Sequence, residues 1–106
     1  MRGRKGIPMA DISVQDLHDL DGVSVVDVRE PDEFASGRVP GAVNIPLQTV
    51  PDALDRLDPE KPVYLICQHG VRSERAASFL EGRGFDVVNV LGGTSAWAEA
   101  GLPLER

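Results

Sequence analysis

The chain contains three short apolar runs in which hydrophobic residues are nearly continuous rather than alternating with polar ones. The runs are Val23–Val28, Val63–Cys67 and Val87–Leu91, and each is rich in β-branched residues. Strands that are buried on both faces of a parallel sheet have this pattern. A helix interior is the alternative interpretation, but each run is too short and too β-branched to favour it. We therefore predict three buried strands.

Apolar residues between these runs recur at the spacing of an amphipathic helix. One stripe consists of Val50, Ala53, Leu54 and Leu57, and a second of Ala76, Ala77, Phe79 and Leu80. The second stripe is followed by Gly82 and Gly84, which disfavour a helix. Both segments are predicted to be helical and to pack one face against the sheet.

Shorter helices are predicted from residues that start or stop a helix. Their ranges are 13–20, 31–35 and 96–100. Ser13 can cap the first, with Asp16 at the third helical position, and Pro31 suits the first turn of the second. Gly101 followed by Pro103 stops the third.

Strands that alternate with helices indicate an α/β domain whose sheet is mostly parallel. In such sheets, ligands bind beyond the C-terminal ends of the strands. We therefore expect functional residues directly after Val28, Cys67 and Leu91. The 106 residues leave little room for two domains, so we predict a single domain over residues 11–106.

The composition is that of a globular protein, with 42% hydrophobic and 26% charged residues. The formal net charge is −6, although Arg2, Arg4 and Lys5 precede the first acidic residue. From Asp11 onward, the remaining eight of the 11 basic residues stand against all 17 acidic ones. Residues 1–10 are therefore predicted to be a flexible basic tail on an acidic domain. This acidity argues against nucleic acid as a partner, and an anionic ligand would need a locally positive site.

Targeting and membrane-spanning segments have characteristic compositions that we do not find in the sequence. Residues 1–10 lack the apolar region of a secretory signal. No stretch approaches the roughly 20 apolar residues of a membrane span. We expect a cytoplasmic protein that has no membrane partner.

Cys67 is the only cysteine of the chain, and it closes the second predicted strand. A single cysteine excludes an intramolecular disulfide, a cysteine-rich zinc site and a dithiol redox motif. Its position between a strand end and a helix N-terminus favours an anion, because the helix dipole and converging N–H groups act there. Arg72 adds a positive charge nearby. These effects lower the pKa of a thiol, and the thiolate is the reactive form, so Cys67 is the candidate nucleophile.

The loop that follows this cysteine is the candidate anion-binding loop. It consists of Gln68, His69, Gly70, Val71 and Arg72. Gly70 allows a positive φ, and Ser73 could donate a hydrogen bond to the thiolate or cap the helix. The alternative interpretation is that Cys67 is a buried structural residue. A purely structural turn, however, would not need a glycine, a histidine and an arginine directly after the cysteine. His69 is open between a general acid or base, an anion contact and a solvated residue.

Asp27 and Arg29 end the first predicted strand, and in a parallel sheet they share an edge with Cys67. An unpaired Asp27 would oppose thiolate formation, so we expect it to fix an arginine or loop amides. An ordinary strand-end salt bridge is the alternative. After the third strand, Gly92–Thr94 lacks the spacing of a nucleotide-binding fingerprint. We predict a turn there, leading into a helix capped by its threonine or by Ser95.

Three segments of the chain resemble single-domain rhodaneses. They are VVDVREPDEFASGRVPGAVNIPL (Val25–Leu47), CQHGVRS with the following AASFLEGRGF, and VLGGTSAWAEAGLPLE (Val90–Glu105). Together with their spacing, they cover nearly everything from Asp11 onward. The resemblance implies a central parallel sheet that is flanked by helices on both faces. It implies neither a metal nor an organic cofactor.

The resemblance also implies sulfurtransferase chemistry. Cys67 would attack the outer sulfur of a small anionic donor such as thiosulfate, release sulfite and hold the sulfur as a persulfide. Cyanide, a thiol or a protein acceptor would then take this sulfur. Loop N–H groups would stabilise the persulfide anion, and Arg72 would position the donor or brace the loop. The protein would be a monomer or a weak homodimer.

Two departures from the family pattern and three other functions bear on this reading. Arg38 stands where the family commonly has histidine, and Gln68 and His69 replace more basic residues of efficient thiosulfate users, which leaves the physiological donor open. Phosphatases and arsenate reductases place five residues between cysteine and arginine, whereas this chain has the four residues Gln68–Val71. A sulfur-carrier or interaction module would use the same cysteine with little free turnover. Non-catalytic rhodanese-like domains often lack it.

Overall fold

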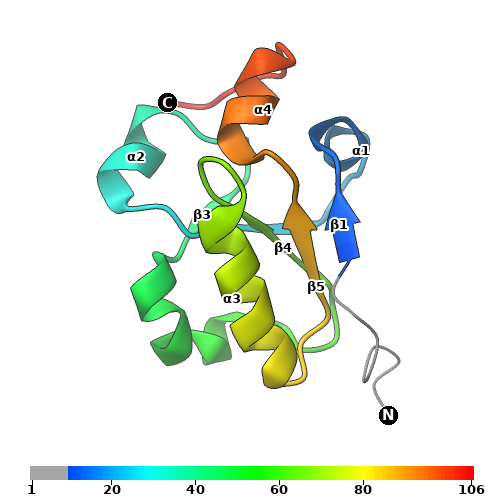
Figure 1. The fold of residues 1–106 in the computed structure, drawn as a ribbon, viewed down its shortest axis with the longest axis vertical. Coiled ribbons are helices and arrows are strands. Elements are labelled where there is room, and N and C mark those ends of the chain that lie inside the picture. Colours follow the sequence, from blue (N-terminus) through cyan, green and yellow to red (C-terminus); the bar gives the residue numbers. More distant parts are fainter. Residues whose placement is uncertain (1–9) are drawn as a thin grey trace.

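A five-stranded parallel sheet forms the centre of the fold in the computed structural model, which describes residues 10–106 (Figure 1). Its strands are β1 (Ala10–Ile12), β2 (Ser24–Asp27), β3 (Val43–Asn44), β4 (Val63–Ile66) and β5 (Val87–Val90). Their order across the sheet is β1-β5-β4-β2-β3, and each neighbouring pair is parallel. The predicted parallel sheet is confirmed.

The three strands that the sequence predicts are β2, β4 and β5, each one or two residues shorter than its apolar run. They occupy the middle of the sheet, which explains why their residues are apolar on both faces. β1 and β3 were not predicted. They are edge strands of three and two residues, too short to leave a recognisable run.

The described residues form four α-helices, α1 (Val14–His18), α2 (Pro31–Ser36), α3 (Val71–Gly82) and α4 (Gly93–Glu99). The Ser13 hydroxyl accepts a hydrogen bond from the Asp16 N–H at 3.1 Å, so the predicted cap of α1 is confirmed. α1 ends two residues before its predicted end at position 20. Pro31 is the first residue of α2, as predicted, and Glu30 and Glu33 form a capping box there.

The stripe between positions 50 and 57 forms two 3₁₀ helices rather than an α-helix. They are η1 (Leu47–Asp52) and η2 (Leu54–Arg56). Pro51 lies inside η1 and has no N–H for an α-helical bond, while Ala53 interrupts the turn with a φ of −116°. Val50 and Ala53 still turn inward and are buried, so the apolar spacing was read correctly and the helix type was wrong.

Each face of the sheet has its own hydrophobic core. One cluster joins β2, β4 and β5 to α3 and η1, and its members include Val26, Leu65, Cys67, Ala76 and Leu80. The other joins the opposite faces of the same strands to α1 and α4, through Leu17, Val25, Ile66, Val90 and Trp97. The expected helices on both faces of the sheet are therefore present.

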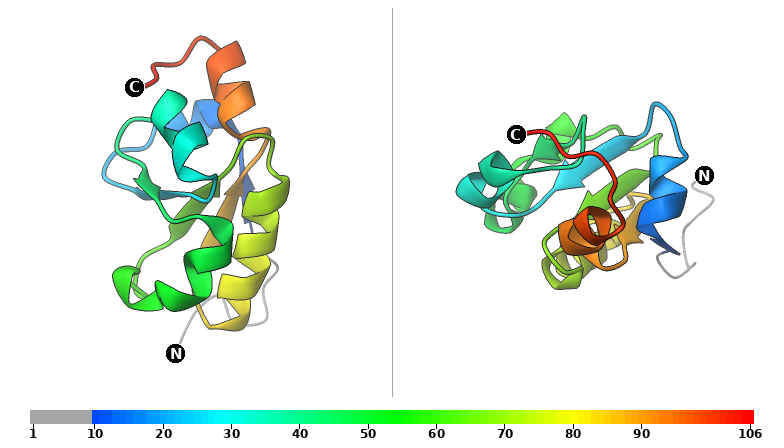
Figure 2. Two further views of the ribbon diagram at one scale, coloured as in Figure 1. Left: turned by 90° about the vertical axis from the view of Figure 1, so that its left-hand side faces the viewer. Right: turned by 90° about the horizontal axis from the view of Figure 1, so that it is seen from above.

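The C-terminal ends of the strands lie at one end of the molecule, where α2 and α4 also gather (Figures 1 and 2). β2 pairs with β4 so that Asp27 is opposite Ile66, which places Asp27 beside Cys67 at that edge. Most of the predicted basic tail, residues 1–9, lies outside the described part of the chain, and the boundary at residue 11 stays a prediction. No helix within residues 10–106 is long and apolar enough to cross a bilayer.

Candidate active site

Cys67 directly follows the central strand β4 and opens a tight turn that ends at the first residue of α3. Gly70 is the N-cap of α3 and has a φ of 104°, so the predicted positive φ is confirmed. This left-handed conformation turns the chain back toward the cysteine, and the Gly70 N–H donates to Cys67 Sγ at 3.1 Å. The strand–turn–helix geometry thus aims backbone donors at the sulfur.

The thiol of Cys67 is subject to two opposed effects. Only 1% of the residue is exposed, and this burial raises the pKa of the thiol. Hydrogen bonding with the Ser73 hydroxyl and with the N–H groups of Ser73, Gly70 and His69 lowers it by more, so the pKa lies below its ordinary value. The arrangement therefore favours a thiolate that is held inside the fold.

Ser73 links the thiol to a second buried polar residue. Cys67 Sγ lies 3.4 Å from Ser73 Oγ, and the Ser73 hydroxyl donates to Asn89 Oδ1 at 2.6 Å. Ser73 is the third residue of α3, so its possible role as the helix cap was wrong. Asn89 was missed by the sequence reasoning. Its signal was present, because a polar residue inside a buried strand needs a partner.

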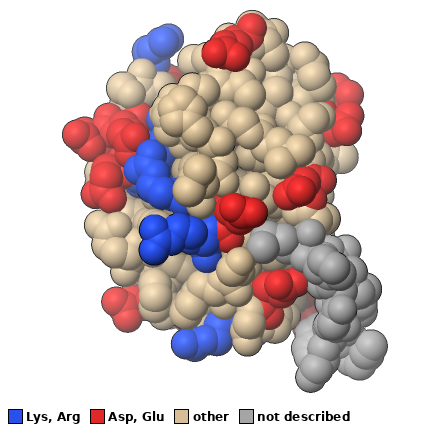
Figure 3. Space-filling view, in the orientation of Figure 1, with Lys and Arg blue, Asp and Glu red and all other residues tan. Residues whose placement is uncertain are grey.

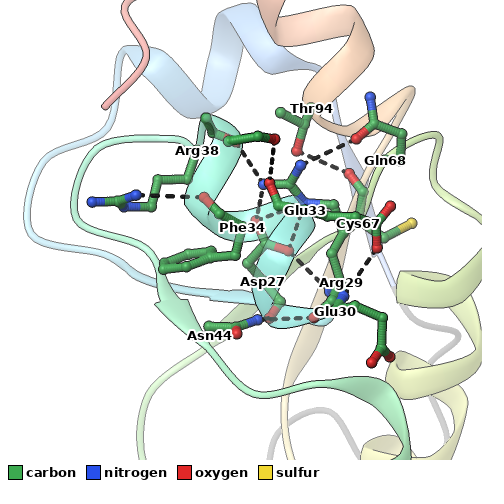
Figure 4. A network of polar contacts seen from close by, with 12 residues as sticks. Asp27, Arg29, Glu30, Glu33, Phe34, Arg38, Asn44, Cys67, Gln68 and Thr94 are labelled. Atoms are coloured by element: carbon green, nitrogen blue, oxygen red, sulfur yellow. Dashed lines mark hydrogen bonds and ion pairs between the residues drawn. The ribbon is translucent and has the colours of Figure 1, made fainter. Parts of the chain in front are cut away.

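Arg29 and Asp27 form a buried ion pair at the end of β2, with 2% and 0% of their surfaces exposed. Arg29 Nε lies 3.0 Å and Nη2 lies 2.9 Å from the Asp27 carboxylate, whose Oδ1 also accepts from the Arg29 backbone N–H. Arg29 Nη2 also donates to the Gly37 carbonyl at 2.8 Å. Asp27 therefore fixes an arginine at the edge of the sheet shared with Cys67 (Figure 4).

Gln68 connects this ion pair to the loop. Arg29 Nη1 donates to Gln68 Oε1 at 3.1 Å, and Gln68 Nε2 donates to Ser95 Oγ at 3.2 Å. The first loop residue is thus held by Arg29, which follows β2 (Figure 4), and by Ser95 of α4. The structure brings together the Asp27, Arg29 and Gln68 positions that were singled out from sequence.

Arg72 is held by a carboxylate of α2. Its Nη1 and Nη2 donate to the two carboxylate oxygens of Glu33 at 2.7 and 3.0 Å. The Arg72 hydrogen bond lowers the pKa of Glu33 to about 2, against a smaller opposing effect of burial. About a third of each side chain is exposed. Glu33 was not predicted, because sequence spacing cannot show which acid lies across the loop from Arg72.

The other two loop positions present their side chains outward. His69 is exposed and contributes its backbone N–H to the thiolate. Val71 is 66% exposed although it is apolar. Of the three roles that the sequence left open for His69, the solvated loop position agrees best with this exposure.

The turn after β5 clamps the loop from behind. The Thr94 N–H and hydroxyl both donate to the Cys67 carbonyl, at 2.8 and 3.0 Å. The Ser95 N–H donates to the Gln68 carbonyl at 3.0 Å. α4 is capped by Gly92, so the predicted cap at Thr94 or Ser95 was wrong. Both residues serve the loop instead of their own helix.

The site as a whole can hold a nucleophilic thiolate and stabilise negative charge on an atom bound to it. Within residues 10–106, no three His, Cys, Asp or Glu side chains are grouped so as to hold a metal ion. The groups that hydrogen-bond with Cys67 Sγ are backbone N–H donors and the Ser73 hydroxyl. Such donors suit a single anionic atom on the thiolate.

Comparison with known proteins gives consistent matches. The rhodanese-like domain family matches residues 12–100. A sulfurtransferase of Allochromatium vinosum is 36% identical over 91 residues, which cover 85% of each chain. A thiosulfate sulfurtransferase, GlpE, of Pseudomonas putida is 39% identical over 83 residues, covering 77% of this chain and 76% of the relative.

Solved structures agree with the sequence matches. A rhodanese-like domain protein from Staphylococcus aureus is 37% identical and superimposes with a TM-score of 0.83, covering 92% of this chain and 100% of that protein. The predicted fold class, an α/β domain of the rhodanese type, is therefore confirmed. The match of residues 12–100, the identities of the relatives and the shared fold together show that this chain belongs to the rhodanese-like domain family.

Proposed function

We propose that this protein is a sulfurtransferase that carries a sulfane sulfur on Cys67. The observation that carries the proposal is the thiol itself. Cys67 is buried, yet its pKa is lowered by the Ser73 hydroxyl and by three backbone N–H groups that converge on Sγ. A purely structural cysteine has no need of such donors.

The reaction has two steps that each conserve atoms and charge. The Cys67 thiolate attacks the outer sulfur of thiosulfate, the S–S bond of thiosulfate breaks, and sulfite leaves with the bonding pair. Cys67 then holds a persulfide anion. A thiolate or cyanide attacks the outer sulfur of this persulfide, and the Cys67 thiolate is regenerated. No net oxidation occurs, since the sulfane sulfur moves between nucleophiles.

The loop residues have distinct roles in this proposal. The N–H groups of Gly70 and His69 stabilise the persulfide anion, as they do the thiolate. Gln68, held between Arg29 and Ser95, fixes the entry to the loop. The names of the relatives, a sulfurtransferase and a thiosulfate sulfurtransferase, support the same reaction class.

Intact-mass measurement tests the proposal. Reduced protein is incubated with thiosulfate, freed of excess reagent and weighed before and after addition of cyanide. We expect the gain of one sulfur atom, which cyanide removes as thiocyanate. Cys67→Ser keeps the size of the side chain and is expected to show no gain. Sulfur transfer that survives in Cys67→Ser would exclude Cys67 as the carrier.

A phosphatase is the second candidate function for a loop with a cysteine and an arginine. The structure favours it less than sulfur transfer. The loop has four residues between Cys67 and Arg72. Arg72 already gives two N–H groups to Glu33 and is therefore not free to embrace a phosphate. Hydrolysis of an aryl phosphate by the wild-type protein, lost in Cys67→Ser, would reverse this preference.

A further inference from the structure

The charged side chains around the loop include acidic ones, and the proposed reaction with an anionic donor does not explain their presence. We define the loop rim as four exposed or partly exposed residues, His69 and Arg72 of the loop and Glu30 and Glu33 at the start of α2. The arginine and the two glutamates of this rim contribute one positive and two negative charges. In the surface view, acidic side chains over α2 border basic ones instead of leaving a purely basic patch (Figure 3).

Arg72 is the arginine among these four rim residues, and the negative charges of Glu33, Glu30 and Cys67 offset its positive charge. Both carboxylate oxygens of Glu33 accept from its guanidinium. The Glu33 hydrogen bond is the largest cause that raises the pKa of Arg72, and the negative charges of Cys67 and Glu30 raise it further. These groups therefore interact electrostatically, and together with the thiolate they leave the entrance net negative.

The second arginine of the site does not supply the missing positive charge. Arg29 is 2% exposed and forms an ion pair with Asp27, which is fully buried. It also donates to the Gly37 carbonyl and to Gln68. The favourable field for an anion then comes from the N–H groups at Cys67 Sγ, which suit one charged sulfur.

An incoming donor meets this entrance before it meets the sulfur. A dianion such as thiosulfate is repelled by a net negative rim, whereas a persulfide with an uncharged or singly charged end is repelled little or not at all. We propose that Glu33 is a specificity-determining residue: by neutralising Arg72, it selects persulfides of low charge over thiosulfate as sulfur donors. This inference rests on the proposed sulfur transfer through Cys67.

The persulfide reaction balances without any further reagent. The Cys67 thiolate attacks the outer sulfur of R–S–SH, the donor S–S bond breaks, and R–S⁻ leaves with the bonding pair. Cys67 then carries –S–SH, whose proton passes to the departing thiolate or to water. The sulfane sulfur keeps its oxidation state, as it does with thiosulfate.

The test compares two donors on two proteins. Initial rates of Cys67 loading are measured by intact mass with thiosulfate and with the hydropersulfide of 2-mercaptoethanol, whose organic group carries no charge, on wild type and on Glu33→Gln. The two donors differ in intrinsic reactivity, so only the change in their rate ratio is diagnostic. Glu33 Oε1 accepts a hydrogen bond from the Glu30 N–H, and the amide oxygen of glutamine can accept the same bond. We expect Glu33→Gln to raise the thiosulfate-to-persulfide ratio by about tenfold at low salt.

Two control variants separate charge from packing. Asp32→Asn removes one negative charge from the same helix, and no ion pair joins Asp32 to an arginine within residues 10–106. It is expected to keep the wild-type ratio. Glu33→Asp keeps the charge on a shorter side chain and is also expected to stay near the wild-type ratio.

The outcomes separate this inference from the proposed function. Loading by both donors with an unchanged ratio in Glu33→Gln would overturn the role of Glu33 and leave sulfur transfer intact. An equal rise in Glu33→Asp would assign the effect to packing and also overturn it. Failure of both donors to load wild-type Cys67 would overturn the proposed function, and this inference with it.

Discussion

The sulfur of Cys67 is held by a short chain of buried polar groups. The thiol donates to Ser73 Oγ, whose own proton goes to Asn89 Oδ1. Because a hydroxyl has one proton, Ser73 can donate to the thiolate only if it gives up its bond to Asn89. The three residues thus form a hydrogen-bond relay that runs from Cys67 Sγ through Ser73 Oγ to Asn89 Oδ1.

Replacement of Ser73 by alanine tests how much this relay contributes to the reactivity of the thiol. The variant loses the side-chain hydrogen bond that lowers the pKa of Cys67, while burial, which raises it, remains. The midpoint of the iodoacetamide alkylation rate against pH is expected to move upward by about one pH unit, which slows alkylation near neutral pH by about tenfold. Above both midpoints, the two rates should converge.

Ser78→Ala is the matched control, because Ser78 is an exposed serine of the same helix. Its alkylation profile should coincide with that of wild type. A Ser73→Ala profile that also coincides with wild type would show that the backbone N–H groups alone lower the pKa. The relay would then be structural.

Sequence reasoning reached the candidate nucleophile and its turn but not the partners of the loop. Cys67 and Gly70 are visible because a strand end, a glycine and a helix start follow one another in the chain. Glu33 lies 39 positions from Arg72, and Asn89 lies 16 positions from Ser73. Contacts of that kind depend on how strands and helices pack, and a single sequence does not record them.

At the scale of the elements, the loop is held between two helix starts. α3 begins where the loop ends and supplies donors to Cys67. On the other side, N–H groups at the start of α4 donate to the carbonyls of Cys67 and Gln68. Gly93 makes this approach possible. It has a φ of 63°, and a Cβ at this position would overlap the carbonyl oxygen of Cys67.

Gly93→Ala is therefore expected to destabilise both the fold and the site. Left-handed backbone strain and the clash with the Cys67 carbonyl together should cost about 2–4 kcal/mol of unfolding free energy, measured by urea denaturation. Gly101→Ala is the control. Gly101 also has a positive φ, but its Cβ would meet no atom within 4 Å, so only the backbone strain of about 1 kcal/mol applies. Equal losses of unfolding free energy in the two variants would contradict the close contact between Gly93 and the Cys67 carbonyl.

The elements also show where a hydrophobic pattern stops being informative. The apolar spacing of residues 50–57 correctly places Val50 and Ala53 inside, yet the backbone forms two 3₁₀ helices because Pro51 breaks the α-helical bonding. The same spacing over α3, which has no proline, predicts an α-helix correctly. The helix type was therefore decided by one residue that the pattern of apolar positions ignores.

At the scale of the whole molecule, the last residues of the chain close the fold over the active-site end. Arg38 and Glu105 exchange backbone hydrogen bonds at 2.9 and 2.8 Å. Trp97, in the core beside α1, donates from Nε1 to the Pro103 carbonyl at 2.6 Å. Gly37, which precedes Arg38, accepts a hydrogen bond from Arg29 through its carbonyl. The closing segment, residues 101–106, therefore helps to hold the residues that contact Arg29.

Trp97→Phe tests the attachment of the closing segment. Phenylalanine keeps an aromatic ring in the core but removes the hydrogen bond to Pro103 and some buried area. We expect a loss of about 1–3 kcal/mol, seen as a thermal midpoint lower by roughly 4 °C or more. An unchanged midpoint would mean that the segment is held by its other contacts alone.

The burial of Cys67 has a consequence for the lifetime of the cargo. A thiolate in water is readily oxidised to sulfenic and then to irreversible sulfinic and sulfonic acids, and a persulfide is more reactive still. At 1% exposure, the resting sulfur is shielded from bulky oxidants by the whole turn. On the proposed function, loading adds one sulfur atom to the end of this buried side chain, and the inner sulfur then lies beneath the transferable one. The turn that slows the access of reagents to Cys67 thus also protects this cysteine from oxidation between one sulfur transfer and the next.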